Sequence, residues 1–271
     1  MADLDTELVW RKVRLGLPAR ESFSSGLPSI YVKPLGILWG KLAKAAVAEG
    51  LALPFLGNGA YTSCQVVLRL RQCYQISHMS AASFGLWRDR QSGALLDEIE
   101  GLSENLSAPR KNKFGGAGTV PGIVGILNVT PDSFSDGGDH YDACMAITRV
   151  LEHAEAGADI VDIGGESTRP GSAKISIADE IDRVLPVVEA AVDSGICVSV
   201  DTRHVDVMQA AIEAGASIIN DVTAFTDDHQ SLEIVAGSSA GIVLMHMQGT
   251  PKTMQQAPAY RLASADIYDW L

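Results

Sequence analysis

The sequence lacks a long hydrophobic run. Its best candidate, residues 42–56, is interrupted by Lys44, Glu49 and Gly50, so it falls short of the roughly 18 to 20 apolar residues that a membrane-spanning helix needs. The first twelve residues, MADLDTELVWRK, carry acidic side chains where a secretory signal peptide has a basic segment. We therefore expect a cytoplasmic protein with no membrane partner.

Paired cysteines are also lacking. Four cysteines stand far apart in the chain, with no CxxC spacing and no histidine cluster beside them: Cys64, Cys73, Cys144 and Cys197. This spacing indicates neither a zinc site nor a disulfide framework.

Basic charge is scarce in the second half of the chain. Residues 121–271 contain 7 Lys and Arg against 23 Asp and Glu, whereas residues 1–120 contain 14 against 10. Nucleic acids are bound through clustered Lys and Arg. We therefore expect no nucleic-acid partner.

A basic, glycine-rich stretch divides the chain. The sequence SAPRKNKFGGAGTVPG begins at Ser107 and has almost no apolar periodicity, which predicts a linker over residues 107–121. Upstream, residues 1–106 contain short apolar runs separated by Gly and Pro, which predicts a small mixed α+β region. No polar constellation stands out there, so we expect an accessory or packing role for it.

Downstream of the linker, residues 122–271 alternate two kinds of segment. Five short runs are rich in β-branched residues, as buried parallel strands are: 123–128, 159–163, 197–201, 217–221 and 241–246. Four segments between them have a helical period: about 143–156, 178–194, 204–214 and 228–236. Ser176 ahead of Asp179 predicts the N-terminal cap of the second helix. Strict alternation predicts a parallel α/β sheet with right-handed crossovers.

Two architectures share this alternation, the eight-fold (β/α) barrel and the open doubly wound sheet. The doubly wound sheet usually has GxGxxG after its first strand, whereas Asn-Val-Thr-Pro-Asp stands there in this chain. A polar residue also closes each of the five apolar runs, where barrel enzymes place catalytic groups: Asn128, Asp162, Asp201, Asn220 and His246. One such residue alone would more often be a cap or a satisfied core group. Five in register favour a barrel with a shared site.

Several of these strand-end residues have useful chemistry. Asn220 offers an acceptor and two donors in one plane and Asp201 offers two acceptors, so together they could recognise the edge of a flat heterocycle. Asn128 is a suitable oxygen ligand for Mg²⁺, which takes few protein ligands and keeps other positions for phosphate and water. We expect Met245 to line the pocket and His246 to be a hydrogen-bonded core residue.

Two loops add candidates. In GGESTRPGS, which begins at Gly164, Arg169 beside Thr168 suits a phosphate or a departing pyrophosphate. In the loop after the first strand, Phe134 either stacks on an aromatic substrate or packs against its own scaffold. Asp136 either serves the site or caps the turn after Pro131.

Five segments resemble, in the same order, the motifs of the dihydropteroate synthase family, pterin-binding enzymes with a TIM-barrel fold. They are GILNVTPDSFSDGG (125–138), ADIVDIGGESTRPGS (158–172), VSVDTR (198–203), IINDVTA (218–224) and LMHMQGTP (244–251). The first two are long and highly specific. Pterin-binding methyltransferases share the barrel and the VDTR-like and NDV-like strand ends but not the full TPDSFSDGG loop, so they are the weaker match.

The resemblance implies a transferase of folate biosynthesis. It would condense 6-hydroxymethyl-7,8-dihydropterin pyrophosphate with 4-aminobenzoate to give 7,8-dihydropteroate and pyrophosphate, with Mg²⁺ as cofactor, and would be a target of sulfonamides. Pyrophosphate would leave first, and the arylamine would then attack the pterin methylene cation. A homodimer is one assembly we consider.

The resemblance also implies roles for matching residues. Asp201 and Asn220 would hold the pterin ring, and Asn128 would meet the magnesium-bound pyrophosphate. The remaining roles fall on the two loops: Arg169 and Thr168 would steady the substrate, Phe134 and Pro170 would form part of the 4-aminobenzoate and sulfonamide pocket, and Asp136 would order its loop.

The family pattern is incomplete in the printed sequence. About five strands are predicted after an N-terminal extension, whereas an eight-strand barrel typically takes ~250 residues. The family's DPGxGFGK, SRK and terminal Arg-x-His motifs do not occur in it. We therefore expect a barrel with only about its first five strands, and little or no synthase activity from this polypeptide alone. Two alternatives stay open: a synthase completed by further sequence or by another polypeptide, and a non-catalytic pterin-binding or interaction remnant.

Overall fold

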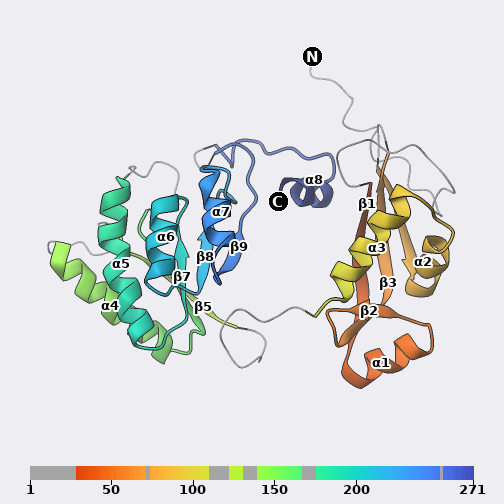
Figure 1. Ribbon diagram of the computed structural model, residues 1–271, viewed down its shortest axis with the longest axis horizontal. Coiled ribbons are helices and arrows are strands. Elements are labelled where there is room, and N and C mark those ends of the chain that lie inside the picture. The colour runs from red at the N-terminus through yellow and green to blue at the C-terminus, as the bar shows by residue number, and fades with distance from the viewer. Residues whose placement is uncertain (1–28, 71–73, 110–121, 131–138, 167–174, 251–252) are drawn as a thin grey trace, which may run out of the picture. The chain divides into compact units, whose positions relative to one another are not determined.

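The chain folds into two compact units. The computed structural model describes residues 29–70, 74–109, 122–130, 139–166, 175–250 and 253–271. One unit comprises residues 1–111 with 260–270, and the other comprises residues 112–259 (Figure 1). Residues 260–270 thus have most of their contacts within the first unit. No helix among the described residues is long and apolar enough to cross a membrane.

The first unit is a small α+β structure, as predicted. Its antiparallel sheet is built around the long strand β3, with which each of the other three strands pairs. The strands are β1 (Ile30–Trp39), β2 (Leu53–Phe55), β3 (Gly59–Arg69) and β4 (Tyr74–Ser80), and the helices are α1 (Gly40–Ala48), α2 (Ala81–Arg88) and α3 (Ala94–Ser107). Ile99 of α3 and Phe84 of α2 pack with Val66 and Leu68 of β3 to form the core.

Helix α8 (Ala263–Trp270) packs against this sheet through charged and aromatic side chains. Arg69 of β3 forms an ion pair with Asp269, whose other carboxylate oxygen accepts a hydrogen bond from the Tyr31 hydroxyl at 2.6 Å. The Tyr74 hydroxyl donates to Asp266 at 3.3 Å. These contacts account for the grouping of residues 260–270 with the first unit.

The second unit is a parallel sheet of five strands in chain order. The strands are β5 (Val124–Asn128), β6 (Ile160–Gly164), β7 (Val198–Asp201), β8 (Ile218–Asp221) and β9 (Gly241–Leu244). The helices between them are α4 (Asp139–Glu155), α5 (Ile177–Asp193), α6 (Val205–Glu213) and α7 (Gln230–Ala236). All five strands and four helices predicted for this region are present. The order is that of a barrel, since a doubly wound sheet reverses direction at a switch point; over the described residues the sheet does not close.

Helix α5 begins with the predicted cap. The Ser176 hydroxyl accepts a hydrogen bond from the Asp179 backbone N–H at 3.1 Å and donates to the Asp179 carboxylate at 2.6 Å. This arrangement satisfies one of the N–H groups left open at the start of a helix. Pro186 lies inside the helix, which continues through it.

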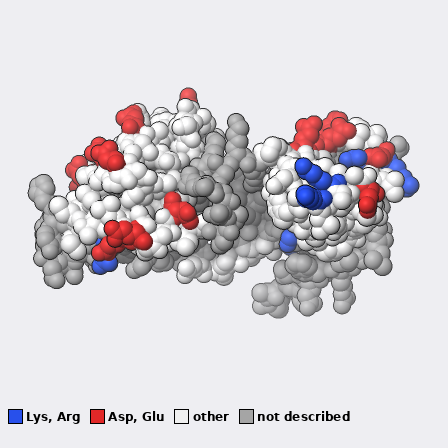
Figure 2. Space-filling model, turned by 90° about the horizontal axis from the view of Figure 1, so that it is seen from below, with Lys and Arg blue, Asp and Glu red and all other residues white. Residues whose placement is uncertain are grey.

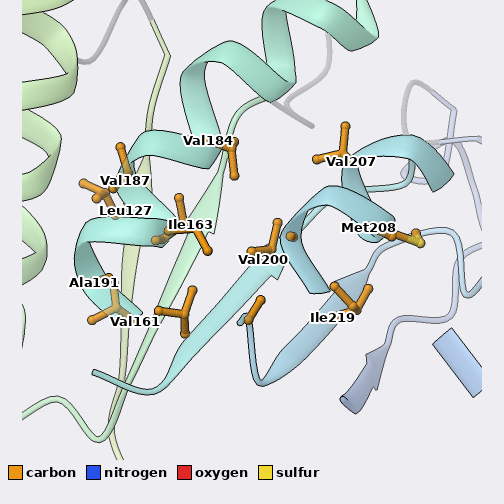
Figure 3. Packing of buried hydrophobic residues seen from close by; sticks show 14 of the residues in the cluster. Leu127, Val161, Ile163, Val184, Val187, Ala191, Val200, Val207, Met208 and Ile219 are labelled. Atoms are coloured by element: carbon orange, nitrogen blue, oxygen red, sulfur yellow. The ribbon is translucent and has the colours of Figure 1, made fainter. Parts of the chain in front are cut away.

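The core of the second unit lies between the helices and one face of the sheet (Figure 3). Strand residues at alternate positions, among them Val161 and Ile163 of β6, pack against Val184 and Val187 of α5. Because strand side chains alternate between faces, the residues between them point away from the helices. Ile126 of β5 is one of these and is 67% exposed.

The two units differ in surface charge, as their sequences do. On the face drawn in Figure 2, the described surface of the second unit shows mainly Asp and Glu, whereas the first unit shows several Lys and Arg residues among its acids. The scarcity of basic side chains therefore belongs to the unit that contains the parallel sheet.

Substitution at the helix-covered face should destabilise the fold. Ile219 of β8 is fully buried, at 0% exposure, so we expect Ile219→Ala to lower the free energy of unfolding by about 2 to 5 kcal/mol, because a cavity replaces packed side-chain atoms. Leu232 of α7 is 58% exposed and supplies the control. We expect Leu232→Ala to change the free energy of unfolding by less than about 0.5 kcal/mol. Urea unfolding followed by circular dichroism measures both. Equal effects would contradict the assignment of the core face.

Candidate functional site

A row of residues crosses the parallel sheet near the carboxyl ends of its strands. Asn128 is paired in register with Gly164, Gly164 with Asp201, Asp201 with Asn220, and Asn220 with Val243. Residues paired in this way point to the same face of a sheet, and here it is the face opposite the helices. The structure thus brings together Asn128, Asp201 and Asn220, three of the residues that the sequence proposed for one site. We call these five positions the strand-end row.

Asp162 lies on the same face, two residues before Gly164. Its Oδ2 accepts a hydrogen bond from the Asn220 side-chain amide at 3.0 Å. Asp162 is only 8% exposed, and among the described residues its Oδ1 is buried with no hydrogen-bond partner. A buried acceptor left unpaired costs on the order of 1 to 3 kcal/mol. Sequence reasoning placed Asp162 at a strand end but gave it no role; the unpaired oxygen makes it a ligand-binding candidate.

Gly164 keeps the middle of the strand-end row open. A Cβ atom at this position would lie 3.5 Å from Asn128 Oδ1 and 3.6 Å from Asp201 Cβ. Those distances are ordinary van der Waals contact, so one methyl group would fit, whereas a larger side chain would fill the space between the two polar groups.

Acidic side chains crowd around Asp201. Burial raises the pKa of Asp201 to about 7, and the neighbouring carboxylates of Asp162, Asp221 and Glu180 add to the effect. Burial and nearby like charge both disfavour the ionised form. Near neutral pH Asp201 is therefore present in both forms and can donate or accept a hydrogen bond. Strongly perturbed carboxyl groups of this kind concentrate at functional sites.

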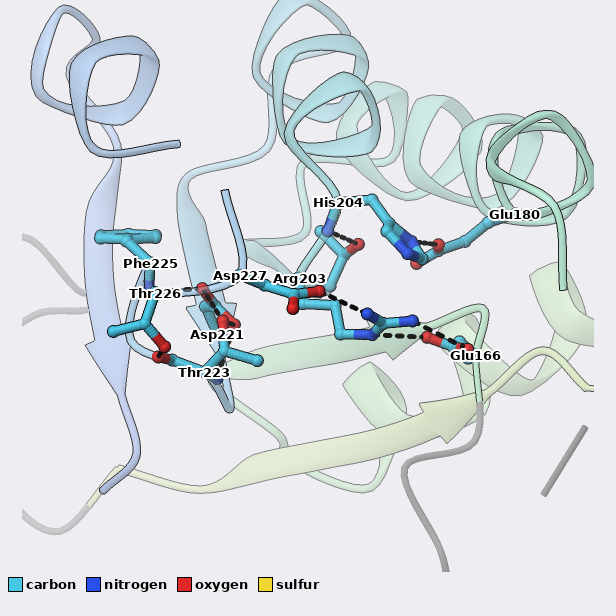
Figure 4. Close-up of polar contacts among 10 residues, drawn as sticks. Glu166, Glu180, Arg203, His204, Asp221, Thr223, Phe225, Thr226 and Asp227 are labelled. Atoms are coloured by element: carbon cyan, nitrogen blue, oxygen red, sulfur yellow. Dashed lines mark hydrogen bonds and ion pairs between the residues drawn. The ribbon is translucent and has the colours of Figure 1, made fainter. Parts of the chain in front are cut away.

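Asp221 holds the turn after β8. Its carboxylate accepts hydrogen bonds from the backbone N–H groups of Thr223 and Phe225, both at 2.7 Å, and from the Thr223 hydroxyl (Figure 4). Ala224 and Phe225 have positive φ angles of 50° and 61°, a backbone conformation that side chains with a Cβ disfavour. These bonds fix the chain directly beyond Asn220.

Two basic residues follow β7. Arg203 Nε donates to Glu166 Oε2 at 3.0 Å, Arg203 Nη2 donates to Glu166 Oε1 at 3.3 Å, and Nη1 forms an ion pair with Asp227. His204 Nδ1 lies 2.5 Å from Glu180 Oε2 (Figure 4). The sequence alone indicated no function for Arg203, His204 or their partners, although Arg203 closes the VDTR segment.

The structure describes only some of the remaining predicted residues. Five lie outside the described residues, and their roles stay predictions: Phe134, Asp136, Thr168, Arg169 and Pro170. Met245 lies one residue beyond β9, is partly buried, and its backbone N–H donates to the Asp221 carbonyl at 3.3 Å. Across the described ranges, no three His, Cys, Asp or Glu side chains gather in a way that could hold a metal ion.

A parallel sheet wound in barrel order, with polar groups facing one space at the carboxyl ends of its strands, defines a ligand-binding α/β protein of the barrel class. Comparison with known families narrows that class. The family model described as "Pterin binding enzyme" matches residues 124–271, which is more than half of the chain. The chain belongs to the pterin-binding enzyme family.

Two sequence relatives confirm the resemblance to dihydropteroate synthases. The chain is 47% identical over 148 residues to the dihydropteroate synthase of Escherichia coli (strain K12), covering 54% of this chain and 52% of that protein. It is 43% identical over 154 residues to the dihydropteroate synthase of Haemophilus influenzae, covering 56% of each. A crystal structure of Yersinia pestis dihydropteroate synthase with a sulfonamide drug is 47% identical, with a TM-score of 0.49, over 55% of this chain and 54% of that one. The chain spans about half the length of the curated relatives it matches.

Replacing Asp201 should alter the dependence of stability on pH. The Asp201 carboxyl ionises near pH 7 in the folded protein but near 3.8 when exposed, so the stability it contributes is complete below about pH 4 and is lost as pH rises through about 7. Asp201→Asn removes this loss. Between about pH 5 and 8, the variant should therefore gain on the order of 1 to 3 kcal/mol in unfolding free energy relative to the wild type.

Urea unfolding at several pH values measures the difference. Asp182→Asn, at an exposed position of α5, is the matched control and should track the wild type at every pH. If the unfolding free energies of Asp201→Asn and the wild type changed with pH in the same way, Asp201 would ionise normally.

Proposed function

We propose that this chain supplies the pterin-binding part of a dihydropteroate synthase, and that Asp162, Asp201 and Asn220 hold the pterin ring. The single observation that carries the proposal is the unpaired, buried Oδ1 of Asp162 beside Asn220. A pterin presents adjacent N–H donors and ring nitrogen acceptors along one edge, which matches carboxylate acceptors and an amide in a row. Curated relatives at 47% and 43% identity carry the name dihydropteroate synthase, which supports the same ligand.

Recognition of the ring would depend on pairing every buried polar atom. Asp162 Oδ1 would accept from a ring N–H or amino group, and Asn220 would offer both a donor and an acceptor. Asp201, with its pKa near 7, could donate to a ring nitrogen or accept from an N–H. A ligand without the matching groups would leave these atoms unpaired, at a cost of about 1 to 3 kcal/mol each, so the site would discriminate strongly.

The proposed reaction joins 6-hydroxymethyl-7,8-dihydropterin pyrophosphate to 4-aminobenzoate. The bond from the pterin methylene to the pyrophosphate oxygen breaks, the arylamine nitrogen attacks the methylene carbon, and the nitrogen releases a proton, which gives 7,8-dihydropteroate and pyrophosphate. No covalent bond to the protein is needed. The protein would contribute position and a polar environment for the separating charges.

Asn128 is suited to hold magnesium at this site. Its Oδ1 lies in the strand-end row beside the open position at Gly164, and Mg²⁺ commonly binds few protein oxygens and completes its shell with phosphate and water. A bound Mg²⁺ would neutralise part of the charge of the departing pyrophosphate. Arg169 and Thr168 would add a cation and a hydroxyl from the loop that begins after Glu166.

Other features of the proposal come from the sequence. Phe134 and Pro170 would form part of the pocket for 4-aminobenzoate and for sulfonamides, Asp136 would order its loop, and Met245 would line the pocket. A cytoplasmic location and a homodimer complete the proposal. Neither a nucleic acid nor a membrane is among the proposed partners.

A second candidate is pterin binding without catalysis. The observation that favours it concerns Arg203, the cation closest to Asp201 in sequence within the described part of the second unit. Arg203 already forms ion pairs with both Glu166 and Asp227. A pyrophosphate at this acidic edge would therefore depend on Mg²⁺ and on residues that the structure does not describe.

Removing the ring-binding side chains should weaken pterin binding. We expect Asn220→Ala and Asp201→Ala each to reduce the affinity for 6-hydroxymethyl-7,8-dihydropterin by about tenfold or more, because each loses at least one buried hydrogen bond. Isothermal calorimetry measures the affinity, and Asp182→Asn should bind as the wild type does. Wild-type protein that fails to bind the pterin would refute the proposed site.

Turnover separates the two candidate functions. Incubation with the pterin pyrophosphate, 4-aminobenzoate and Mg²⁺ should yield dihydropteroate if the chain is catalytically competent, with detection by chromatography. Pterin binding with no product would instead support the non-catalytic candidate for this polypeptide.

Filling the gap at Gly164 should block the ligand selectively. Because a single Cβ fits at 3.5 Å from Asn128 Oδ1, we expect Gly164→Ala to keep pterin affinity within about threefold of the wild type, whereas the branched side chain of Gly164→Val should lower it by about tenfold or more. Calorimetry on both variants, with thermal unfolding as a check of folding, makes the comparison. Equal affinities would place the ligand elsewhere.

A further inference from the structure

Two consecutive residues, Arg203 and His204, each bind an acid on a different segment. Arg203 contacts both carboxylate oxygens of Glu166, which lies two residues beyond β6. His204 Nδ1 lies 2.5 Å from Glu180, in the first turn of α5. Glu166 and Glu180 are therefore the anchored residues on either side of residues 167–174.

These contacts are sheltered from water. Glu180 is 1% exposed, and the side chains of Arg203, His204 and Glu166 are each less than one fifth exposed. Removing one partner of a buried ion pair leaves the other charge without compensation. Charge pairing therefore holds Glu166 and Glu180 in place. A solvent-exposed ion pair, by contrast, contributes little to stability.

The turn that carries both basic residues is tied to the strand-end row. Asp201 and Arg203 are separated by Thr202 alone, whose backbone N–H donates to the Asn220 carbonyl at 3.0 Å. The Thr202 hydroxyl in turn accepts from the His204 backbone N–H at 3.2 Å. Arg203 and His204 are thus fixed relative to Asp201 and Asn220.

We propose that Arg203 and His204 are positioning residues that hold both flanks of residues 167–174 to the strand end carrying Asp201. They set the positions of Glu166, beyond β6, and of Glu180, at the start of α5, relative to the strand-end row. The effect on ligand binding rests on the proposed function, because it concerns a substrate whose ring lies on that row and whose pyrophosphate extends from it.

The His204 contact should depend on pH. Its hydrogen bond to Glu180 raises the pKa of His204 above the ordinary 6.5. The charged groups that face it are Glu180 of α5, Glu166 beyond β6 and Arg203 on its own turn. The ion pair is complete below pH 6.5 and is lost as pH rises through the raised pKa. Glu180→Gln keeps an acceptor for His204 and removes the charge, which makes it the matched variant.

The first arm of the test is hydrogen exchange of the full chain, measured by mass spectrometry. We expect Arg203→Met to speed exchange at residues 164–166 by about tenfold, and Glu180→Gln to remove the pH dependence of exchange at the start of α5 between about pH 6 and 8, after correction for intrinsic rates. Arg203→Lys, which keeps the charge without the two-pronged contact, should give an intermediate rate. Helix α4 serves as the internal reference and should not change.

The second arm compares two ligands by calorimetry, the pterin alcohol and the pterin pyrophosphate. In the proposed site Asp201 would contact the ring of both ligands, so its direct effect on ring binding is common to the two affinities. We expect Arg203→Met to reduce the ratio of the affinity for the pterin pyrophosphate to that for the pterin alcohol by about fivefold or more. The ratio should fall with rising pH more steeply in the wild type than in Glu180→Gln.

The outcomes are distinguishable. Unchanged exchange at both flanks would overturn the proposal. Faster exchange with an unchanged ratio would also overturn it, because the contacts would then be structural and without effect on ligand position. Wild-type protein that binds neither ligand would refute the proposed function, and the exchange arm alone would then decide whether Arg203 and His204 hold the flanks.

Discussion

The parallel register of β5 to β9 determines the arrangement of the candidate site in the second unit. Strands that run in the same direction bring their carboxyl ends to one edge, and this register sets Asn128, Gly164, Asp201 and Asn220 side by side. A shift of one residue in any strand would turn its polar residue toward the helices and its core residue outward. The alternation that buries the valines and isoleucines under the helices is thus the same one that presents the site.

Each acid near this edge has different hydrogen-bond partners, which offset the free-energy cost of burying its carboxyl group. Asp221 accepts backbone N–H groups, Glu180 contacts His204, and Asp162 uses one oxygen on Asn220. What remains uncompensated is the second oxygen of Asp162 and the raised pKa of Asp201. Both groups lie on the face of the sheet opposite the helices, where we propose that a ligand satisfies them.

The fold of the second unit was predictable because its signals are local. Periodicity and β-branched runs identify strands and helices, and the position of polar residues at strand ends follows from the barrel rule. The place of α8 was not predictable, because its ion pair joins Arg69 and Asp269, 200 positions apart, and no period specifies which sheet a helix covers. The contacts of Arg203 and His204 were missed for a similar reason, since ion pairs between separate turns leave no repeating pattern.

In the proposed site, Asp162, Asp201 and Asn220 form one pterin-binding surface. A crystal structure of the chain with bound 7,8-dihydropterin tests it most directly. We expect the ring edge to lie within hydrogen-bonding distance of Asp162 Oδ1, Asp201 and Asn220, beside Gly164. A pterin bound away from this row, or a row that stays empty at saturating ligand, would contradict it.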